Sequence, residues 1–171
     1  MSAVRRDHRR SGALVTLLAV LIGGFLISSR SDAPAPPAQA IAPHADEARR
    51  RFDQAVVMLH AKQYEHAVTA LHRVLALSPQ LPEAHVNMGF ALLGLKRVEE
   101  ARDFFDGATA LRPNQANAYY GLALAYEAGG DLSMATGAMR SYLHLARDER
   151  PEHLRRARAA LWEWEQASKP K

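Results

Sequence analysis

Residues 82–113 have the sequence PEAHVNMGFALLGLKRVEEARDFFDGATALRP. It predicts two helices, over about 82–94 and 98–111, joined by a turn at Lys96-Arg97. Gly89 and Ala101 are small residues on the two helices, and they allow a close approach of one backbone to the other. The stretch therefore predicts one helical hairpin.

The hairpin recurs along the chain. Shifting the sequence against itself by 34 residues aligns Ala67 with Ala101 and Ala135, Leu77 with Leu111 and Leu145, and Pro79 with Pro113. A fixed period of roughly 20–50 residues is typical of a repeat array, in which each unit packs against its neighbours. Further helices are predicted over about 46–60, 64–77, 116–128 and 132–147.

The repeated unit resembles the tetratricopeptide repeat, a 34-residue hairpin with the pattern W-x2-L-G-x2-Y, then A-x3-F, then P. The central unit has His85-x2-Met88-Gly89-x2-Leu92, Ala101-x3-Phe105 and Pro113. The unit before it has Arg51-x2-Gln54-Ala55-x2-Met58, Ala67-x3-Leu71 and Pro79. The unit after it has Tyr119-x2-Leu122-Ala123-x2-Tyr126, Ala135-x3-Met139, and Arg147 in place of the proline. The resemblance covers about Asp46 to Arg147.

The resemblance implies an all-α fold, a right-handed superhelical array of three hairpins closed by a C-terminal capping helix. The repeats are expected at about 48–81, 82–115 and 116–149, within residues 45–148. The capping helix is expected at 150–167, where Leu154, Ala157, Leu161 and Trp164 share one face. Polar residues at normally apolar positions of the first unit, Arg51 and Gln54, are consistent with a terminal repeat.

One transmembrane helix is predicted ahead of the array. Residues 11–29 carry no charge, and at about 1.5 Å per residue they span the roughly 30 Å hydrocarbon layer. The basic residues of the tail 1–10 predict a cytoplasmic N-terminus, with the repeats on the periplasmic or extracytoplasmic side of the inner or plasma membrane. Residues 30–44 are rich in proline and alanine and predict a linker.

A cleaved signal peptide is the alternative to this signal-anchor. Ala38-Gln39-Ala40 matches a cleavage site, but it lies 13 residues beyond the end of the apolar run at Ile27. Both interpretations export the repeats. A buried soluble helix fits poorly, because the run is apolar on every face.

Composition excludes several classes of function. The formal net charge is +4, but residues 44–171 carry 17 Lys and Arg against 16 Asp and Glu, so most of the basic excess lies in the N-terminal tail. No basic stripe with interleaved aromatic residues is present, which argues against nucleic-acid binding. The chain has no cysteine, which excludes thiol catalysis, Cys-ligated zinc and disulfides.

No catalytic or metal-binding motif is present. His60, His66 and His72 are spaced by six residues and do not converge on one helix face. No HExxH, GxSxG or phosphate loop occurs. We therefore expect a non-enzymatic protein with no cofactor, no metal and no small-molecule substrate.

The resemblance implies that the first helix of each hairpin lines a concave face that binds peptides of partner proteins. It assigns to this groove Phe52, Val56, Leu59, Val86, Asn87, Phe90, Leu93, Tyr120, Leu124 and Glu127. Only Asn87 matches the Lys, Arg and Asn cluster with which some members clamp a C-terminal carboxylate. We therefore expect an apolar helix or extended segment as the ligand. The alternative is that several of these residues pack between repeats or under the C-terminal helix.

The predicted function is that of an adaptor or assembly factor, which binds a partner protein at the membrane. The layout is similar to that of membrane-anchored repeat proteins of c-type cytochrome maturation and of cell-envelope assembly. A structural subunit held in a membrane complex through its transmembrane helix is one alternative. A soluble cytosolic co-chaperone is another, and it requires that residues 11–29 do not insert into a membrane.

Overall fold

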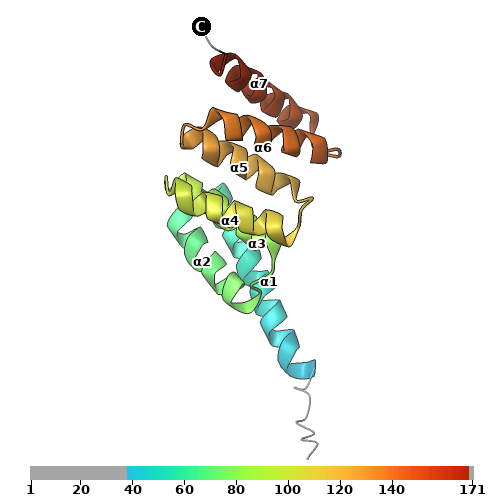
Figure 1. Cartoon of the computed structure of the whole chain (residues 1–171). Helices are drawn as coiled ribbons and strands as arrows, with labels where there is room; N and C mark the ends of the chain where they lie inside the picture. Colours follow the sequence, from blue (N-terminus) through green and yellow to red (C-terminus); the bar gives the residue numbers. More distant parts are fainter. Residues whose placement is uncertain (1–37, 170–171) are drawn as a thin grey trace, which may run out of the picture. The chain divides into compact units, whose positions relative to one another are not determined.

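The computed structural model describes residues 38–169, which form seven α-helices (Figure 1). Their bounds are α1 Ala38–His60, α2 Tyr64–Leu77, α3 Pro82–Gly94, α4 Val98–Leu111, α5 Ala116–Ala128, α6 Leu132–Leu145 and α7 Pro151–Ala167. The predicted basic tail 1–10 and membrane segment 11–29 lie outside the described residues. None of the described helices has the length and apolarity that crossing a membrane requires.

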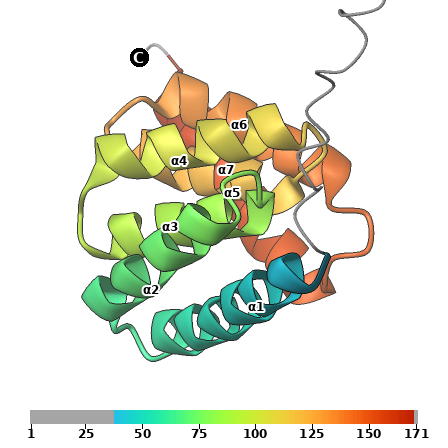
Figure 2. The ribbon, with the colours of Figure 1, turned by 90° about the horizontal axis from the view of Figure 1, so that it is seen from below.

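The helices pair in chain order. α1 packs against α2, α3 against α4, and α5 against α6, so each pair forms an antiparallel hairpin (Figures 1 and 2). Successive hairpins meet through α2 with α3 and through α4 with α5, and α7 packs on α6. The first helices of the hairpins also touch one another, α1 with α3 and α3 with α5. The predicted array of three hairpins and a capping helix is confirmed.

The start of α1 differs from the sequence prediction. The helix begins at Ala38, not near residue 46, so the last part of the predicted linker is helical. Three of the four linker prolines precede residue 38, and the segment 38–42 is rich in alanine, the strongest helix former. Only Pro43 lies inside the helix, where it removes one backbone hydrogen bond.

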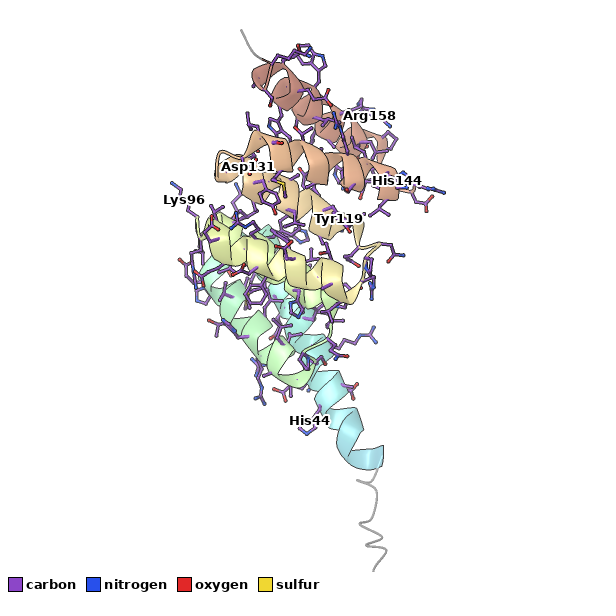
Figure 3. The ribbon with its side chains drawn as sticks, viewed as in Figure 1. His44, Lys96, Tyr119, Asp131, His144 and Arg158 are labelled. Atoms are coloured by element: carbon purple, nitrogen blue, oxygen red, sulfur yellow. The ribbon has the colours of Figure 1, made fainter. Side chains whose placement is uncertain are left out.

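The three turns inside the hairpins have the same geometry. The equivalent residues Lys62, Lys96 and Gly130 have positive φ angles of 58°, 60° and 81°. In each turn the next N–H donates to the carbonyl five residues before it, as Arg97 N does to Leu92 O at 2.9 Å. Lys96 and Asp131 accordingly lie at the same end of the hairpins, and Tyr119 and His144 lie at the other (Figure 3). The repeat in sequence is therefore a repeat in backbone geometry.

Asp131 caps the N-terminus of α6, because its Oδ1 accepts a hydrogen bond from Met134 N at 3.0 Å. Asp131→Ala is expected to lower the free energy of unfolding by about 1 kcal/mol, since the amide loses its acceptor. Urea denaturation measures the effect. Asp131→Asn keeps an acceptor and is expected to cost much less, so equal losses for both variants would show that the hydrogen bond to Met134 N is not the cause of the loss.

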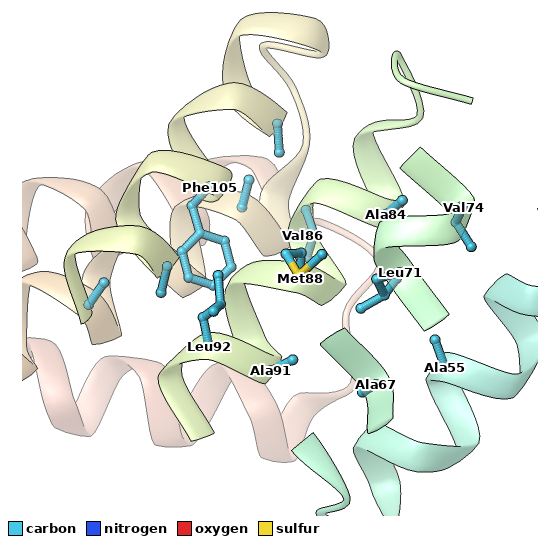
Figure 4. Close-up of a cluster of buried hydrophobic side chains, with 14 of the residues drawn as sticks. Ala55, Ala67, Leu71, Val74, Ala84, Val86, Met88, Ala91, Leu92 and Phe105 are labelled. Atoms are coloured by element: carbon cyan, nitrogen blue, oxygen red, sulfur yellow. The ribbon is translucent and has the colours of Figure 1, made fainter. Parts of the chain in front are cut away.

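A fully buried phenylalanine, Phe105, joins the second and third hairpins. It lies in a cluster of small and aliphatic side chains from α1 to α5 (Figure 4). Its ring fits against Gly89 on α3 and Gly121 on α5, and a Cβ placed on either glycine would overlap the ring. The ring therefore needs both glycines, Gly89 from its own hairpin and Gly121 from the next one.

Gly121→Ala is expected to lower the free energy of unfolding by about 1–3 kcal/mol, because the added methyl group forces the Phe105 ring out of its position. Gly137→Ala is the matched control, since no atom lies within 4 Å of a Cβ at that exposed helical position. It is expected to raise stability by about 0.5–1 kcal/mol through helix propensity. Urea denaturation measures both. A neutral or stabilising Gly121→Ala would contradict the packing described here.

Candidate functional site

A hollow of about 330 Å³ opens between α1 and α3. It is lined by Val56, Leu59, His60, Tyr64, Asn87 and Phe90. Four of these, Val56, Leu59, Asn87 and Phe90, were predicted as groove residues from the sequence. Their side chains are half-buried, so apolar surface remains available around the single amide of Asn87. We call this hollow the apolar groove.

Phe52 lies nearer the N-terminal end of α1, in a second hollow of about 490 Å³. This hollow is lined by Ala45, Ala48, Arg49, Phe52, Ser78, Leu81, Glu83 and Arg112. Glu83 and Arg112 form an ion pair on its wall. Phe52 is thus half-buried and lies in a hollow separate from the apolar groove.

Two predicted groove residues of α3, Val86 and Leu93, do not line the apolar groove. Val86 is only 4% exposed and belongs to the core, so it cannot contact a partner, and the prediction for this residue is wrong. Leu93 is half-buried and packs against the same core. Val86 is buried because its helix α3 has a neighbouring hairpin on each side. Phe52 occupies the equivalent position of α1, which is the terminal helix of the array, and it stays half-buried.

None of the predicted groove residues of α5, which are Tyr120, Leu124 and Glu127, lines the apolar groove. Glu127 accepts a hydrogen bond from Trp164 Nε1 of α7 at 2.9 Å. Tyr120 packs against Tyr142 of α6, with ring centroids 5.0 Å apart. Leu124 is half-buried and packs into neither core cluster. A side chain of the C-terminal helix therefore contacts the end of α5, whereas Leu124 keeps part of its surface exposed to solvent.

An aromatic series links the apolar groove to the third hairpin. The ring of Phe90 lies 5.0 Å from Phe105 and 6.5 Å from Tyr120, which in turn contacts Tyr142. Tyr142 was not predicted from the sequence, because it lies on the second helix of its hairpin, which the resemblance places away from the groove. His60 was also missed, although its spacing of four residues from Val56 places both on one face of α1.

A smaller cavity of about 180 Å³ lies at the far end of this series. It is lined by Tyr120, Tyr142, His153 and Arg156, which come from α5, α6 and α7. The cavity opens where the packing of the array changes. The first helices of successive hairpins contact one another, α1 with α3 and α3 with α5, but the Cα atoms of α7 stay more than 8 Å from those of α5. We call it the α7 pocket.

The surroundings of the α7 pocket shift the pKa values of Glu149 and Tyr142 in opposite directions. The pKa of Glu149 is lowered because its carboxylate accepts hydrogen bonds from the Arg150 backbone N–H and from the His153 ring, each at 2.9 Å. The pKa of Tyr142 is raised, chiefly by burial. Within residues 38–169, no group of three His, Asp or Glu side chains has the geometry to hold a metal ion.

Comparison with known proteins identifies the repeat. The sequence profile of the family described as Tetratricopeptide repeat matches residues 58–118. No curated protein matches the chain.

Solved structures match most of the described residues. The Yersinia enterocolitica type III secretion chaperone SycD, in complex with a peptide of the translocator YopD, is 13% identical, covers 72% of this chain and 96% of its own, and has a TM-score of 0.67. The second TPR domain of human RPAP3, in complex with the HSP70 peptide SGPTIEEVD, is 20% identical, with coverages of 71% and 98% and a TM-score of 0.62. The Aspergillus fumigatus Sgt2 TPR domain is 19% identical, with coverages of 73% and 85% and a TM-score of 0.64. At these identities the similarity shows the fold.

The repeated turn geometry, the three hairpins and the family profile all indicate the same helical repeat. Residues 58–118 thus match the tetratricopeptide repeat model, and the described helices have the fold of tetratricopeptide repeat domains.

Proposed function

We propose that this domain binds a segment of a partner protein in the apolar groove. The observation that carries the proposal is the hollow between α1 and α3, in which half-buried Val56, Leu59 and Phe90 surround the amide of Asn87. Structures with the same fold from Yersinia and human proteins are in complex with peptides. The proposed role is that of an adaptor or assembly factor without enzymatic activity.

The chemistry of the groove favours an apolar ligand. Each aliphatic or aromatic side chain that becomes fully buried contributes about 1.5–3 kcal/mol, so two or three such contacts are sufficient for a transient complex. The Asn87 amide can both donate to and accept from a peptide backbone. A helix or an extended segment with apolar residues on one side satisfies both requirements.

The test is co-purification in mild detergent followed by mass spectrometry. Val56→Asp places charge in the apolar groove, and Leu124→Asp places charge at a predicted groove residue of α5. Neither residue belongs to a core cluster, and we expect the partner to be lost from the double variant. Phe90→Asp is unsuitable, because Phe90 packs on Phe105 and its loss would destabilise the fold. Val57→Asp is the matched control, since Val57 is 67% exposed and lies outside the groove. Retention of every partner by a folded Val56→Asp/Leu124→Asp variant would refute the proposal.

We further propose that residues 11–29 anchor the domain in the inner or plasma membrane, with the repeats on the extracytoplasmic side. The uncharged run and the arginines before it support this topology. Membrane fractionation with protease protection tests it, and recovery of the protein in the soluble fraction would contradict it.

Replacing residues 11–29 by an unrelated membrane anchor separates two functions. An adaptor keeps its activity after this replacement, whereas a structural subunit held through this helix loses it.

A further inference from the structure

We infer that the α7 pocket binds a carboxylate of the same partner segment, an inference that rests on the proposed function. The pocket is lined by two phenol rings, an imidazole and a guanidinium, Tyr120, Tyr142, His153 and Arg156. It lacks an acidic side chain in its lining. This combination of one fixed positive charge and hydroxyl donors is suited to an oxyanion.

Tyr142 supplies a donor that the protein leaves unused. Its side chain is only 3% exposed, but its hydroxyl keeps contact with solvent and forms no hydrogen bond to another described residue. A hydroxyl that is satisfied only by water can exchange that water for a ligand oxygen. A ligand oxygen in the pocket, which Tyr142 lines, would accept this hydrogen bond.

Arg156 supplies a charge that is also unused. The ion pairs at α7 join Arg140 to Glu165, Arg150 to Glu152 and His153 to Glu149. Arg156 belongs to none of them within the described residues. Glu149 is the acidic group close to Tyr142, and its carboxylate is already bound by the Arg150 N–H and by His153. The positive charge of Arg156 is therefore available to a ligand.

The position of the pocket connects it with the apolar groove. Tyr120 forms part of the pocket wall, and its ring centroid lies 6.5 Å from that of Phe90, which lines the groove. A single segment can thus place apolar side chains at Phe90 and a carboxylate at Arg156. The pocket, at about 180 Å³, has room for one small acidic group. This contact would select acidic partners, whereas the groove alone selects only apolar ones.

The test uses small carboxylates, so that it reads the pocket independently of the partner. The full chain, in non-ionic detergent and with ¹³C-labelled tyrosine rings, is titrated by NMR at constant ionic strength. N-acetylglycine offers a main-chain carboxylate, Nα-acetylglutamate α-amide offers a side-chain carboxylate, and N-acetylglycinamide offers neither. We expect at least one acid to shift the Tyr142 and Tyr120 signals, with a dissociation constant on the order of millimolar, and the neutral amide to shift neither.

Matched arginine variants assign the effect. Arg156→Gln is expected to weaken the binding of the acid about tenfold, whereas Arg155→Gln, an equal charge change at an exposed residue outside the pocket, leaves it unchanged. The acid that binds shows whether a chain terminus or an acidic side chain is recognised. Absence of shifts with both acids, or shifts that persist in Arg156→Gln, would overturn the inference. Neither result affects the groove proposal, which stands or falls on Val56 and Leu124.

Discussion

Phe105→Ala is expected to lower the free energy of unfolding by about 3–5 kcal/mol, which is a large part of the stability of a small domain. Phe105 is completely buried, packs on Gly89 within the second hairpin and contacts Gly121 of the third. The alanine leaves a cavity, and the surrounding helices can close it only by shifting from their packed positions. Urea denaturation followed by circular dichroism measures the loss, which can separate into two transitions if the hairpins uncouple.

A double-mutant cycle tests whether the contact with Gly121 is the cause. In Phe105→Ala/Gly121→Ala the new methyl group enters space that the ring has left. The combined loss is therefore expected to be smaller than the sum of the two single losses by about 0.5–3 kcal/mol. Simple addition of the two losses would mean that Phe105 and Gly121 act independently, contrary to their contact in the structure.

Trp164→Ala is expected to release α7 from the array, with a loss of about 3–5 kcal/mol in the stability of the C-terminal end. Trp164 is 5% exposed, packs in the second core cluster and donates its Nε1–H to Glu127. Because each element of a repeat array contacts only its neighbours, the loss should be local. Hydrogen exchange should therefore accelerate in α7 and along the exposed face of α6, while α1 to α4 stay protected.

The second tryptophan is the control for this result. Trp162 lies two residues away on the same helix but is 63% exposed, and Trp162→Ala is expected to change stability by no more than about 0.5 kcal/mol. The fluorescence that remains in Trp164→Ala should be that of an indole in water, since it comes from Trp162 alone. Unchanged protection of α7 in Trp164→Ala would show that α7 is held by other contacts.

The periodicity of the sequence predicted the helices well because each repeat builds the same local structure. Lys62, Lys96 and Gly130 have the same left-handed backbone, and Ala67, Ala101 and Ala135 are all fully buried. These features depend on neighbours within one hairpin, which the period preserves. The start of α1 was predicted less well, because no repeat precedes it and composition alone decided the expectation.

The groove was predicted only in part, because exposure depends on contacts between hairpins that the period does not contain. Val86 occupies the same repeat position as Phe52 and Tyr120, yet it is buried because α3 has neighbours on both sides. Gly121 is equivalent to Asp53 and Asn87, so nothing in the repeat pattern indicates that its missing side chain makes room for Phe105. Arg156 lies outside the repeats, and its place beside Tyr142 follows from how α7 docks on α6.

The most direct test of the central claim is where a bound partner lies. A photo-reactive amino acid is introduced at position 56, inside the apolar groove, or at position 57, which points away from it. The full chain is irradiated in intact cells, and cross-linked products are identified by mass spectrometry. The groove proposal predicts a specific adduct from position 56 that is absent from position 57. An adduct from position 57 alone, or equal adducts from both, would contradict it.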